Sequence, residues 1–353
     1  MPKETRRLGK ERLNPLHDWT STRDEVKYLR THVEELQFEN IRLSVENAHL
    51  KIQSFGSRLF ESHGATDSKS PQCNGQAGGM CPSKIRGVKL LVEGPSANIY
   101  KILDLHGLKF VLKEPKGECE KNRMLEESKT LAICKTKAIP GIAPGFFYKG
   151  RYGEGIVRPL FSLNLGLDMS KNFSFVRLFS IAKQVSNALS HLNADLLMHG
   201  KITFENVLIY DDAAFLVDFG DGCALDETGI SDPVKTFDKC QNHLLPPAVA
   251  LKGFPTGEGT DYWSLIMIAI GVIFGRDIPP LNYTDSRRSY VELFEKRQFS
   301  CGRTFPGNLD KALRRLVEFI DKQLTQRNSS LGDNECFRNA IEGFLAACLP
   351  DIM

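Results

Sequence analysis

The sequence contains no run of 18 apolar residues, which is the minimum length for a helix that crosses a membrane. The basic segment from Met1 to Arg12 is not followed by an apolar stretch, so it lacks the pattern of a secretory signal. The composition of 41% hydrophobic and 25% charged residues is close to that of average globular domains, which argues against wholesale disorder or a fibrous repeat. We therefore expect a globular protein that does not engage a membrane.

The chain also lacks a large excess of charge of either sign. Its 46 Lys and Arg residues against 43 Asp and Glu residues leave a net charge of +3, which is too small for a general nucleic-acid binder. No CxxC pair occurs among the nine cysteines, and their odd number weakens a disulfide framework, so we predict neither a zinc site nor a disulfide scaffold. These absences predict reduced thiols in a cytoplasmic or nuclear protein.

The average composition hides segments of unlike character. One stretch is free of glycine and proline, and a later one is rich in Gly, Ser and Pro and too poor in apolar groups to offset its chain entropy. The predicted organisation is a basic N-terminal tail at 1–21, a leucine-zipper-like coiled coil at 22–60, a flexible linker at 61–85 and a globular domain at 86–353.

Leucine recurs at every seventh position within residues 22–52, as in the seam of a coiled coil. The two seam positions hold Leu29, Leu36, Leu43 and Leu50 at d, and Val26, Val33, Asn40 and Asn47 at a. An asparagine at a favours two parallel helices in register, because it can then hydrogen-bond its symmetry mate. We expect this segment to pair with a second copy or with the zipper of another protein.

Two other interpretations of this segment were weighed. It could be an amphipathic helix that docks on the globular domain of its own chain. A basic leucine zipper that reads DNA would need a continuous basic helix leading into the seam. Pro15 interrupts such a helix, and acidic residues at Asp18, Asp24 and Glu25 intervene, so direct DNA recognition is not expected.

Four short patterns follow in a fixed order between residues 88 and 348. They are the strand-like KFVLK ending at Lys113, the loop HGKITFEN from His199 to Asn206, the tripeptide Asp218-Phe219-Gly220, and Asp261-x-Trp263-Ser264-Leu265. In order and spacing this set resembles the protein kinase superfamily. The resemblance implies an α+β, bilobal fold with a small β-rich N-lobe and a larger helical C-lobe, preceded here by the parallel coiled-coil helix.

The resemblance also implies a role for individual residues. Lys113 matches the lysine that neutralises the α- and β-phosphates of ATP, and Glu127 matches the helical glutamate that orients it. Asn206 and Asp218 match the Mg²⁺ ligands, whose hard oxygen atoms suit that ion. Further positions match the residues that line the nucleotide site: Gly94, Ile99, Val111 and Leu208.

The sequence departs from the family pattern at positions that the family uses for phosphoryl transfer. Position 201 of the catalytic loop, two residues after His199, should be an Asp that accepts the proton of the substrate hydroxyl, but it is Lys201. A lysine side chain is ordinarily protonated at pH 7 and cannot take that proton. The glycine-rich loop is also eroded, since Val92 and Ala97 replace two of its three glycines and only Gly94 remains. We therefore expect ATP and Mg²⁺ to bind weakly or not at all.

These features predict a pseudokinase-like domain that acts as a dimerising scaffold or an allosteric signalling partner rather than as an enzyme. The C-terminal string ECFRNAIEGFLAACL and the HG form of the loop show a weak resemblance to Bub-type spindle-checkpoint kinases and pseudokinases, which implies a mitotic checkpoint or a related pathway. The alternative is an active, atypical Ser/Thr kinase with a displaced base, such as Asp221 or Glu205. Small-molecule phosphotransferases of the aminoglycoside and choline kinase type rank third.

Overall fold

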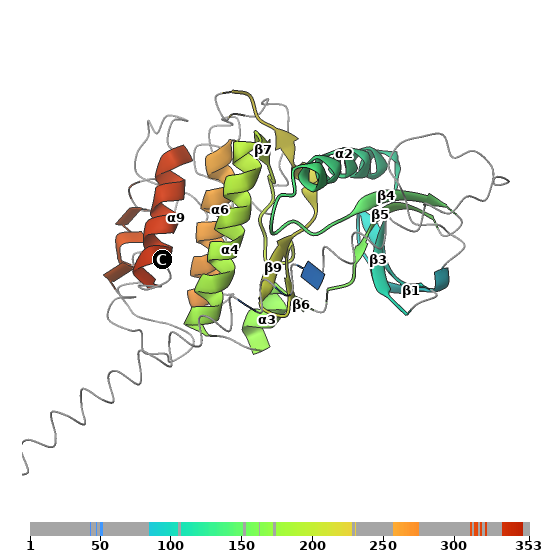
Figure 1. Ribbon diagram of the computed structural model, residues 1–353, viewed down its shortest axis with the longest axis horizontal. Helices are drawn as coiled ribbons and strands as arrows, with labels where there is room; N and C mark the ends of the chain where they lie inside the picture. The colour runs from blue at the N-terminus through green and yellow to red at the C-terminus, as the bar shows by residue number, and fades with distance from the viewer. Residues whose placement is uncertain are drawn as a thin grey trace, which may run out of the picture. The chain divides into compact units, whose positions relative to one another are not determined.

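Five antiparallel strands form one sheet in the computed structural model of this chain, and Figure 1 shows them beside helix α2. Their spatial order is β1-β2-β3-β5-β4, and their bounds are β1 (Ile85–Glu93), β2 (Ala97–Asp104), β3 (Lys109–Pro115), β4 (Phe146–Gly150) and β5 (Gly153–Pro159). The structure describes residues 85–104, 107–150, 153–161, 163–171, 174–227, 230, 257–274 and 334–348, with isolated residues in 43–51 and 311–322.

The two faces of this sheet differ in chemistry because successive side chains of a strand point to opposite sides. One face holds a buried apolar cluster of Ile102, Phe110, Leu112, Phe146, Tyr148 and Val157. The other face carries the alternate residues of the same strands, among them Val111 and Lys113 of β3 and Ile156 of β5. The polar members of this second face can therefore contribute to a site.

Helix α2 (Glu118–Thr136) contacts β3, β4 and β5. Its sequence is dominated by straight-chain helix formers, and its acidic first turn and Lys135 in the last turn complement the helix dipole. The residues that it buries are spaced three or four apart, so they form one stripe: Met124, Glu127, Leu131 and Cys134. Three of them are apolar, and the fourth brings a carboxylate to the sheet.

Short strands follow β5 and carry the loops of the site. They are β6 (Leu163–Asn164), β7 (Leu197–Met198), β8 (Val207–Tyr210), β9 (Ala213–Leu216) and β10 (Cys223–Ala224). Strands β6, β8 and β9 form a three-stranded sheet, and β10 pairs with β7. Helix α3 (Leu165–Lys171) follows β6, and one 3-10 turn, η2 (Phe219–Asp221), follows β9.

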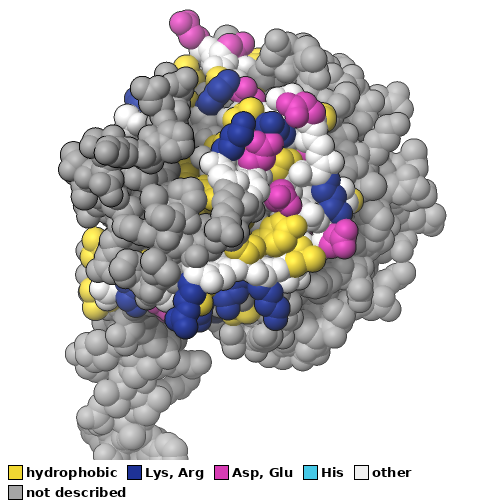
Figure 2. Space-filling view, turned by 90° about the vertical axis from the view of Figure 1, so that its right-hand side faces the viewer, with side chains coloured by type: hydrophobic (Ala, Val, Ile, Leu, Met, Phe, Trp, Pro, Cys, Tyr) yellow, Lys and Arg dark blue, Asp and Glu magenta, His cyan; other side chains and the backbone are white. Residues whose placement is uncertain are grey.

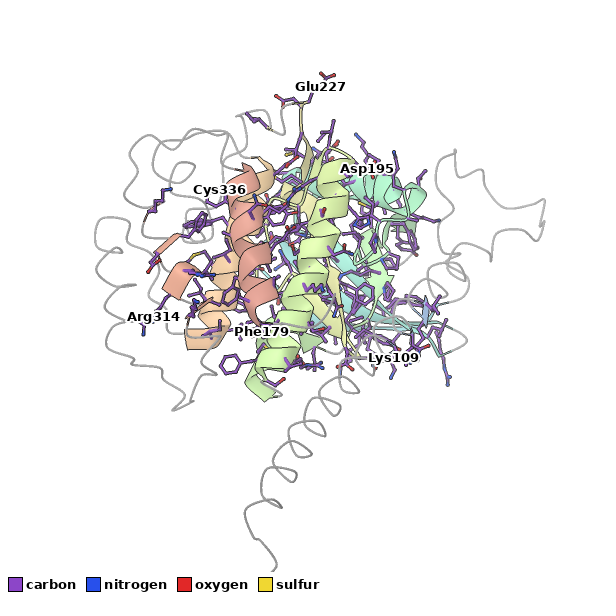
Figure 3. All side chains as sticks on the ribbon, turned by 60° about the vertical axis from the view of Figure 1, so that its left-hand side comes forward. Lys109, Phe179, Asp195, Glu227, Arg314 and Cys336 are labelled. Carbon is purple, nitrogen blue, oxygen red and sulfur yellow. The ribbon has the colours of Figure 1, made fainter. Side chains whose placement is uncertain are left out.

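Three helices pack against one another beside these short strands: α4 (Phe175–Ala194), α6 (Glu258–Phe274) and α9 (Asn334–Cys348). Helix α6 is apolar on almost every side, as expected for a helix that lies between α4 and α9. Phe179 of α4, labelled in Figure 3, meets Phe344 of α9 edge to face at 5.5 Å. Trp263 of α6 meets Phe337 of α9 edge to face at the same distance. Among the described helices, none is long and apolar enough to cross a membrane.

The predicted α+β class is confirmed. Strand β1 begins at Ile85, the last residue of the predicted linker. The basic tail at 1–21 and almost all of the linker lie outside the described residues. The same holds for most of the predicted coiled coil, of which four residues are described, all helical: Leu43, Asn47, Leu50 and Lys51.

Candidate functional site

Three charged side chains from distant parts of the sequence meet beside the sheet. Lys113 extends from β3, and its Nζ atom lies 3.5 Å from Oε2 of Glu127 on α2. The same ammonium group donates a hydrogen bond to Asp218, which stands between β9 and η2. The structure thus brings together three of the residues that the sequence assigned to one site.

The electrostatics of this cluster follow from burial and from the charges within it. Burial alone would raise the pKa of Asp218, but the charge and the hydrogen bond of Lys113, with help from Lys201, lower it to about 2. Burial raises the pKa of Glu127, although Lys113 opposes the shift. Burial also disfavours the charged form of Lys113, but the two carboxylates outweigh it and raise its pKa. Lys113 is therefore a cation held by acidic neighbours.

Asp218 reaches the cluster because the backbone turns sharply at this residue. Its φ of 68° and ψ of 63° are left-handed, a conformation that aspartate tolerates better than most residues. The turn directs Phe219 inward, where its ring lies 4.4 Å from the ring of His199. A buried aromatic contact thus holds the turn that presents the carboxylate.

Asp261 of helix α6 anchors the start of the loop from His199 to Asn206. The two carboxylate oxygens of Asp261 accept hydrogen bonds from the backbone N–H groups of His199 and Gly200, at 2.8 and 2.9 Å. Gly200 has a φ of 78°, and a β-carbon there would lie 2.4 Å from the carbonyl oxygen of Asp221, so only glycine fits. The first residues of the loop are thereby fixed to the helical core.

His199 is buried and holds a second part of the loop. Its Nε2 atom donates to the carbonyl oxygen of Val217 at 2.9 Å, and its Nδ1 atom accepts from the backbone N–H of Lys201 at 3.3 Å. Burial lowers the pKa of His199 to about 4, so the ring is neutral at pH 7. A neutral imidazole that uses both nitrogen atoms in this way is a structural link rather than a general base.

Asn206 lies at the other end of the loop. Its side-chain amide donates to the carbonyl oxygen of Lys201 at 3.0 Å, and its backbone carbonyl accepts from Val217 at 3.1 Å. The amide oxygen of Asn206 is thus the side-chain atom that could join Asp218 in holding a metal ion. Within the described part of the chain, no group of three or more His, Cys, Asp and Glu side chains is arranged as a metal site.

Lys201 lies in the middle of this loop and is partly exposed. Its Nζ atom is 3.5 Å from Oδ2 of Asp221, and Oδ1 of Asp221 accepts a hydrogen bond from Arg123 of helix α2. Asp221 therefore stands between two cations, one from the loop and one from the helix. The sequence did not predict this contact between α2 and η2, because no pattern of apolar residues marks the face of α2 on which Arg123 lies.

The residues predicted to line a nucleotide site fall into two places. Ile99 pairs with Lys113 across the sheet, and Val111 is buried on the same face. Gly94 begins the tight turn between β1 and β2, where its N–H donates to the carbonyl of Ala97 at 3.0 Å. Leu208 lies instead on β8, in an apolar cluster whose described members include no residue of the five-stranded sheet: Ala143, Phe161, Leu208, Ala213, Phe215 and Val217.

One charged residue of this face escaped the sequence analysis. Arg158 of β5 pairs with Val111, so it shares the face of Lys113, and it interacts electrostatically with Glu127 and Asp218. The signal was present in the string GIVRPL, where an arginine alternates with Ile156 within an otherwise apolar strand. It becomes meaningful only once the pairing of β3 with β5 is known.

Comparisons of the sequence with protein-family models and with curated proteins find no match to this chain. The arrangement of the site must therefore be interpreted from its own residues. It combines a cation between two carboxylates, an amide and a carboxylate suited to a metal ion, and a lysine in the loop between them.

Proposed function

We propose that residues 86–353 form a bilobal, protein-kinase-like domain that does not transfer phosphate and instead acts as a scaffold or allosteric signalling partner. The observation that carries the proposal is the position of Lys201. It lies in the loop between His199 and Asn206, with its ammonium group beside Asp221, where a kinase would need a proton acceptor.

The contacts around the site support the kinase-like part of the proposal. The Lys113–Glu127 pair, the left-handed Asp218, and the hydrogen bond from Asn206 to the loop each occur where a kinase requires them. Lys113, Glu127 and Asp218 lie far apart in the sequence and meet in one cluster. Their coincidence is much harder to obtain by chance than any single short motif.

The chemistry of the loop supports the non-catalytic part. A protonated lysine cannot accept the proton of a substrate hydroxyl, and it replaces a negative charge by a positive one. Among the described carboxylates, Asp221 lies within ion-pair distance of Lys201, but it also accepts a hydrogen bond from Arg123. A carboxylate between two cations is a poor base, because both neighbours favour its charged form.

The residues fit part of an ATP–Mg²⁺ complex. Asp218 and Asn206 would hold the metal ion, and Lys113 would face the phosphates, while Ile99 and Val111 are bulky for the base. ATP would supply a transferable phosphoryl group when bound. The turn at Gly94 offers few donors, since its N–H is used by Ala97 and Pro95 has none. We propose weak binding without turnover.

The signalling role rests on the N-terminal segment and on the surface of the domain. Leu43 and Leu50, two of the four seam leucines, are exposed on the single chain, as a seam that receives a second helix requires. We propose pairing with a second copy of the chain or with the zipper of another protein. The pathway proposed is a mitotic checkpoint or a related one, in the cytoplasm or the nucleus.

A turnover assay tests this proposal. The full chain is incubated with Mg²⁺ and γ-labelled ATP, alone and with a general protein substrate, beside an Asp218→Ala variant. We expect no phosphate release or transfer above that of the variant. Transfer by the wild-type chain that disappears in Asp218→Ala would overturn the proposal and establish the active atypical kinase instead.

A further inference from the structure

Arg158 and Lys113 are neighbours on one face of the sheet. Val111 lies opposite Arg158 and Ile156 lies opposite Lys113, so the two cations are diagonal neighbours across adjacent strands. Such positions lie about 7–8 Å apart at the backbone, within reach of one another for long side chains. The same face receives Glu127 and Asp218, which interact with both cations.

The two cations differ in their partners. Lys113 already contacts both carboxylates. Arg158 is half-buried, and among the described residues it forms no hydrogen bond or ion pair within contact distance. Burial lowers its pKa, while the more distant Glu127 and Asp218 oppose the shift. The guanidinium nitrogen atoms of Arg158 are not fully buried, so water reaches them, and a ligand that offers several acceptors can take the place of that water.

We propose that Lys113 and Arg158 make this face of the sheet a binding site for a compact polyphosphate, whose neighbouring phosphates these two side chains hold. Phosphate oxygens match the planar fork of a guanidinium group and satisfy several of its donors at once. It rests on the proposed function, which assigns nucleotide binding to this face of the sheet, and it names the chemistry of the ligand that the face prefers.

An uncharged nucleobase is a less suitable ligand for Arg158 than a phosphate. It would remove the guanidinium group further from water and return at most one or two acceptors, so the buried charge would stay uncompensated. An anion compensates the charge as well as the donors. We therefore expect the affinity to follow the phosphate part of a ligand rather than its base.

The probes are tripolyphosphate, ATP and adenosine, each titrated with Mg²⁺ into the full chain and followed by calorimetry and by the thermal unfolding midpoint. Adenosine should bind at least tenfold more weakly than tripolyphosphate. Arg158→Met keeps the length of the side chain and removes its charge. It should weaken tripolyphosphate binding roughly tenfold to a hundredfold, which is the range that hydrogen bonds to a charged group supply.

The matched control is Arg86→Met, which removes the same charge from the exposed start of β1 on the same sheet. It should leave tripolyphosphate binding within twofold, and both variants should keep the unfolding midpoint of the unliganded protein within a few degrees. Arg158→Lys keeps the charge but not the planar guanidinium group, so its affinity for tripolyphosphate should lie between those of the wild type and Arg158→Met.

Three results would overturn the inference: no tripolyphosphate binding by the wild type, adenosine binding as tightly as tripolyphosphate, or equal losses in Arg158→Met and Arg86→Met. Failure of the proposed function is read from a different signal, namely phosphate transfer that depends on Asp218. A chain that transfers phosphate and still prefers tripolyphosphate to adenosine would refute the non-catalytic function and support the polyphosphate site.

Discussion

At the scale of single residues, the site is defined by how a few buried polar groups are satisfied. Asp261 is fully buried and accepts two backbone N–H groups, and His199 uses both ring nitrogen atoms. Each of these residues compensates groups that would otherwise be buried without partners. The loop that carries Lys201 owes its shape to them rather than to the lysine itself.

The neutral state of His199 makes a prediction for the dependence of stability on pH. Its pKa is about 4 in the folded protein, against about 6.5 in an unfolded chain. Between these values the unfolded chain binds more protons, so this residue lowers the free energy of unfolding as the pH falls. In His199→Gln the contribution is absent. From pH 6.5 to pH 5, the wild type should lose roughly 1.5 kcal/mol relative to the variant.

The measurement is urea unfolding of both proteins at several pH values. Burial raises the pKa of Asp261 to about 7, which gives a contribution of the opposite sign, but it is shared by both proteins and cancels in their difference. Glutamine keeps an amide donor and acceptor for the neighbouring backbone groups. Stability curves that stay parallel between pH 6.5 and 5 would show that His199 is not held neutral.

At the scale of elements, strand β1 forms one border of the five-stranded sheet. Strand β1 is an edge strand, and several of its apolar side chains are exposed: Val88, Leu90, Leu91 and Val92. Figure 2 shows hydrophobic side chains on this side of the molecule next to a row of Lys and Arg side chains. An apolar edge is a template for pairing with other chains, and flanking charges limit such pairing.

This border predicts how a charge on β1 changes association. A Leu90→Lys, Leu91→Lys double variant should raise the onset temperature of light scattering, because added edge charges oppose strand pairing. The free energy of unfolding should change by about 0.5 kcal/mol or less per site, as is usual for exposed positions. Lys89→Gln, which removes a charge from the same strand, should not raise the onset. An unchanged onset in the double variant would contradict the prediction.

The elements themselves were largely predictable, and the site was predictable only in part. The hydrophobic spacing indicated strands around Lys113 and helices over residues 174–197 and 260–275, which the structure gives as β3, α4 and α6. The role of Arg158 could not be predicted, because its face is set by the register of β5 against β3. The Arg123–Asp221 contact depends in the same way on how α2 lies against η2.

At the scale of the whole molecule, one ion pair links a described residue of the predicted coiled coil to a residue far along the chain. Lys51 forms an ion pair with Asp211 at 3.2 Å, and both side chains are about half exposed. An exposed pair of this kind contributes little to stability, at most about 1 kcal/mol. We therefore expect association of this segment to depend on the seam leucines rather than on this ion pair.

The predicted coiled coil can be tested in the full chain. Replacing Leu36 and Leu43 by proline should abolish self-association, because proline breaks the helix and removes two seam side chains. The thermal midpoint of the globular domain should stay within a few degrees. Sedimentation equilibrium measures the mass, and a Lys51→Gln variant serves as the control that disturbs the same segment without touching the seam. A mass that both variants leave unchanged would exclude these residues as the oligomerising element.

The sequence by itself determined the elements, their order and the charge at position 201, because spacing and side-chain type are local properties of the chain. Only the tertiary structure decided which charges meet. Lys113 and Asp218 are 105 positions apart, and Asp261 holds a loop some 60 positions before it. Periodicity tells which face of a strand a residue occupies, but not which side chains lie opposite. Which side chains lie opposite one another depends on strand register and on the packing of α2 against η2. The register of β5 against β3 places Arg158 beside Lys113.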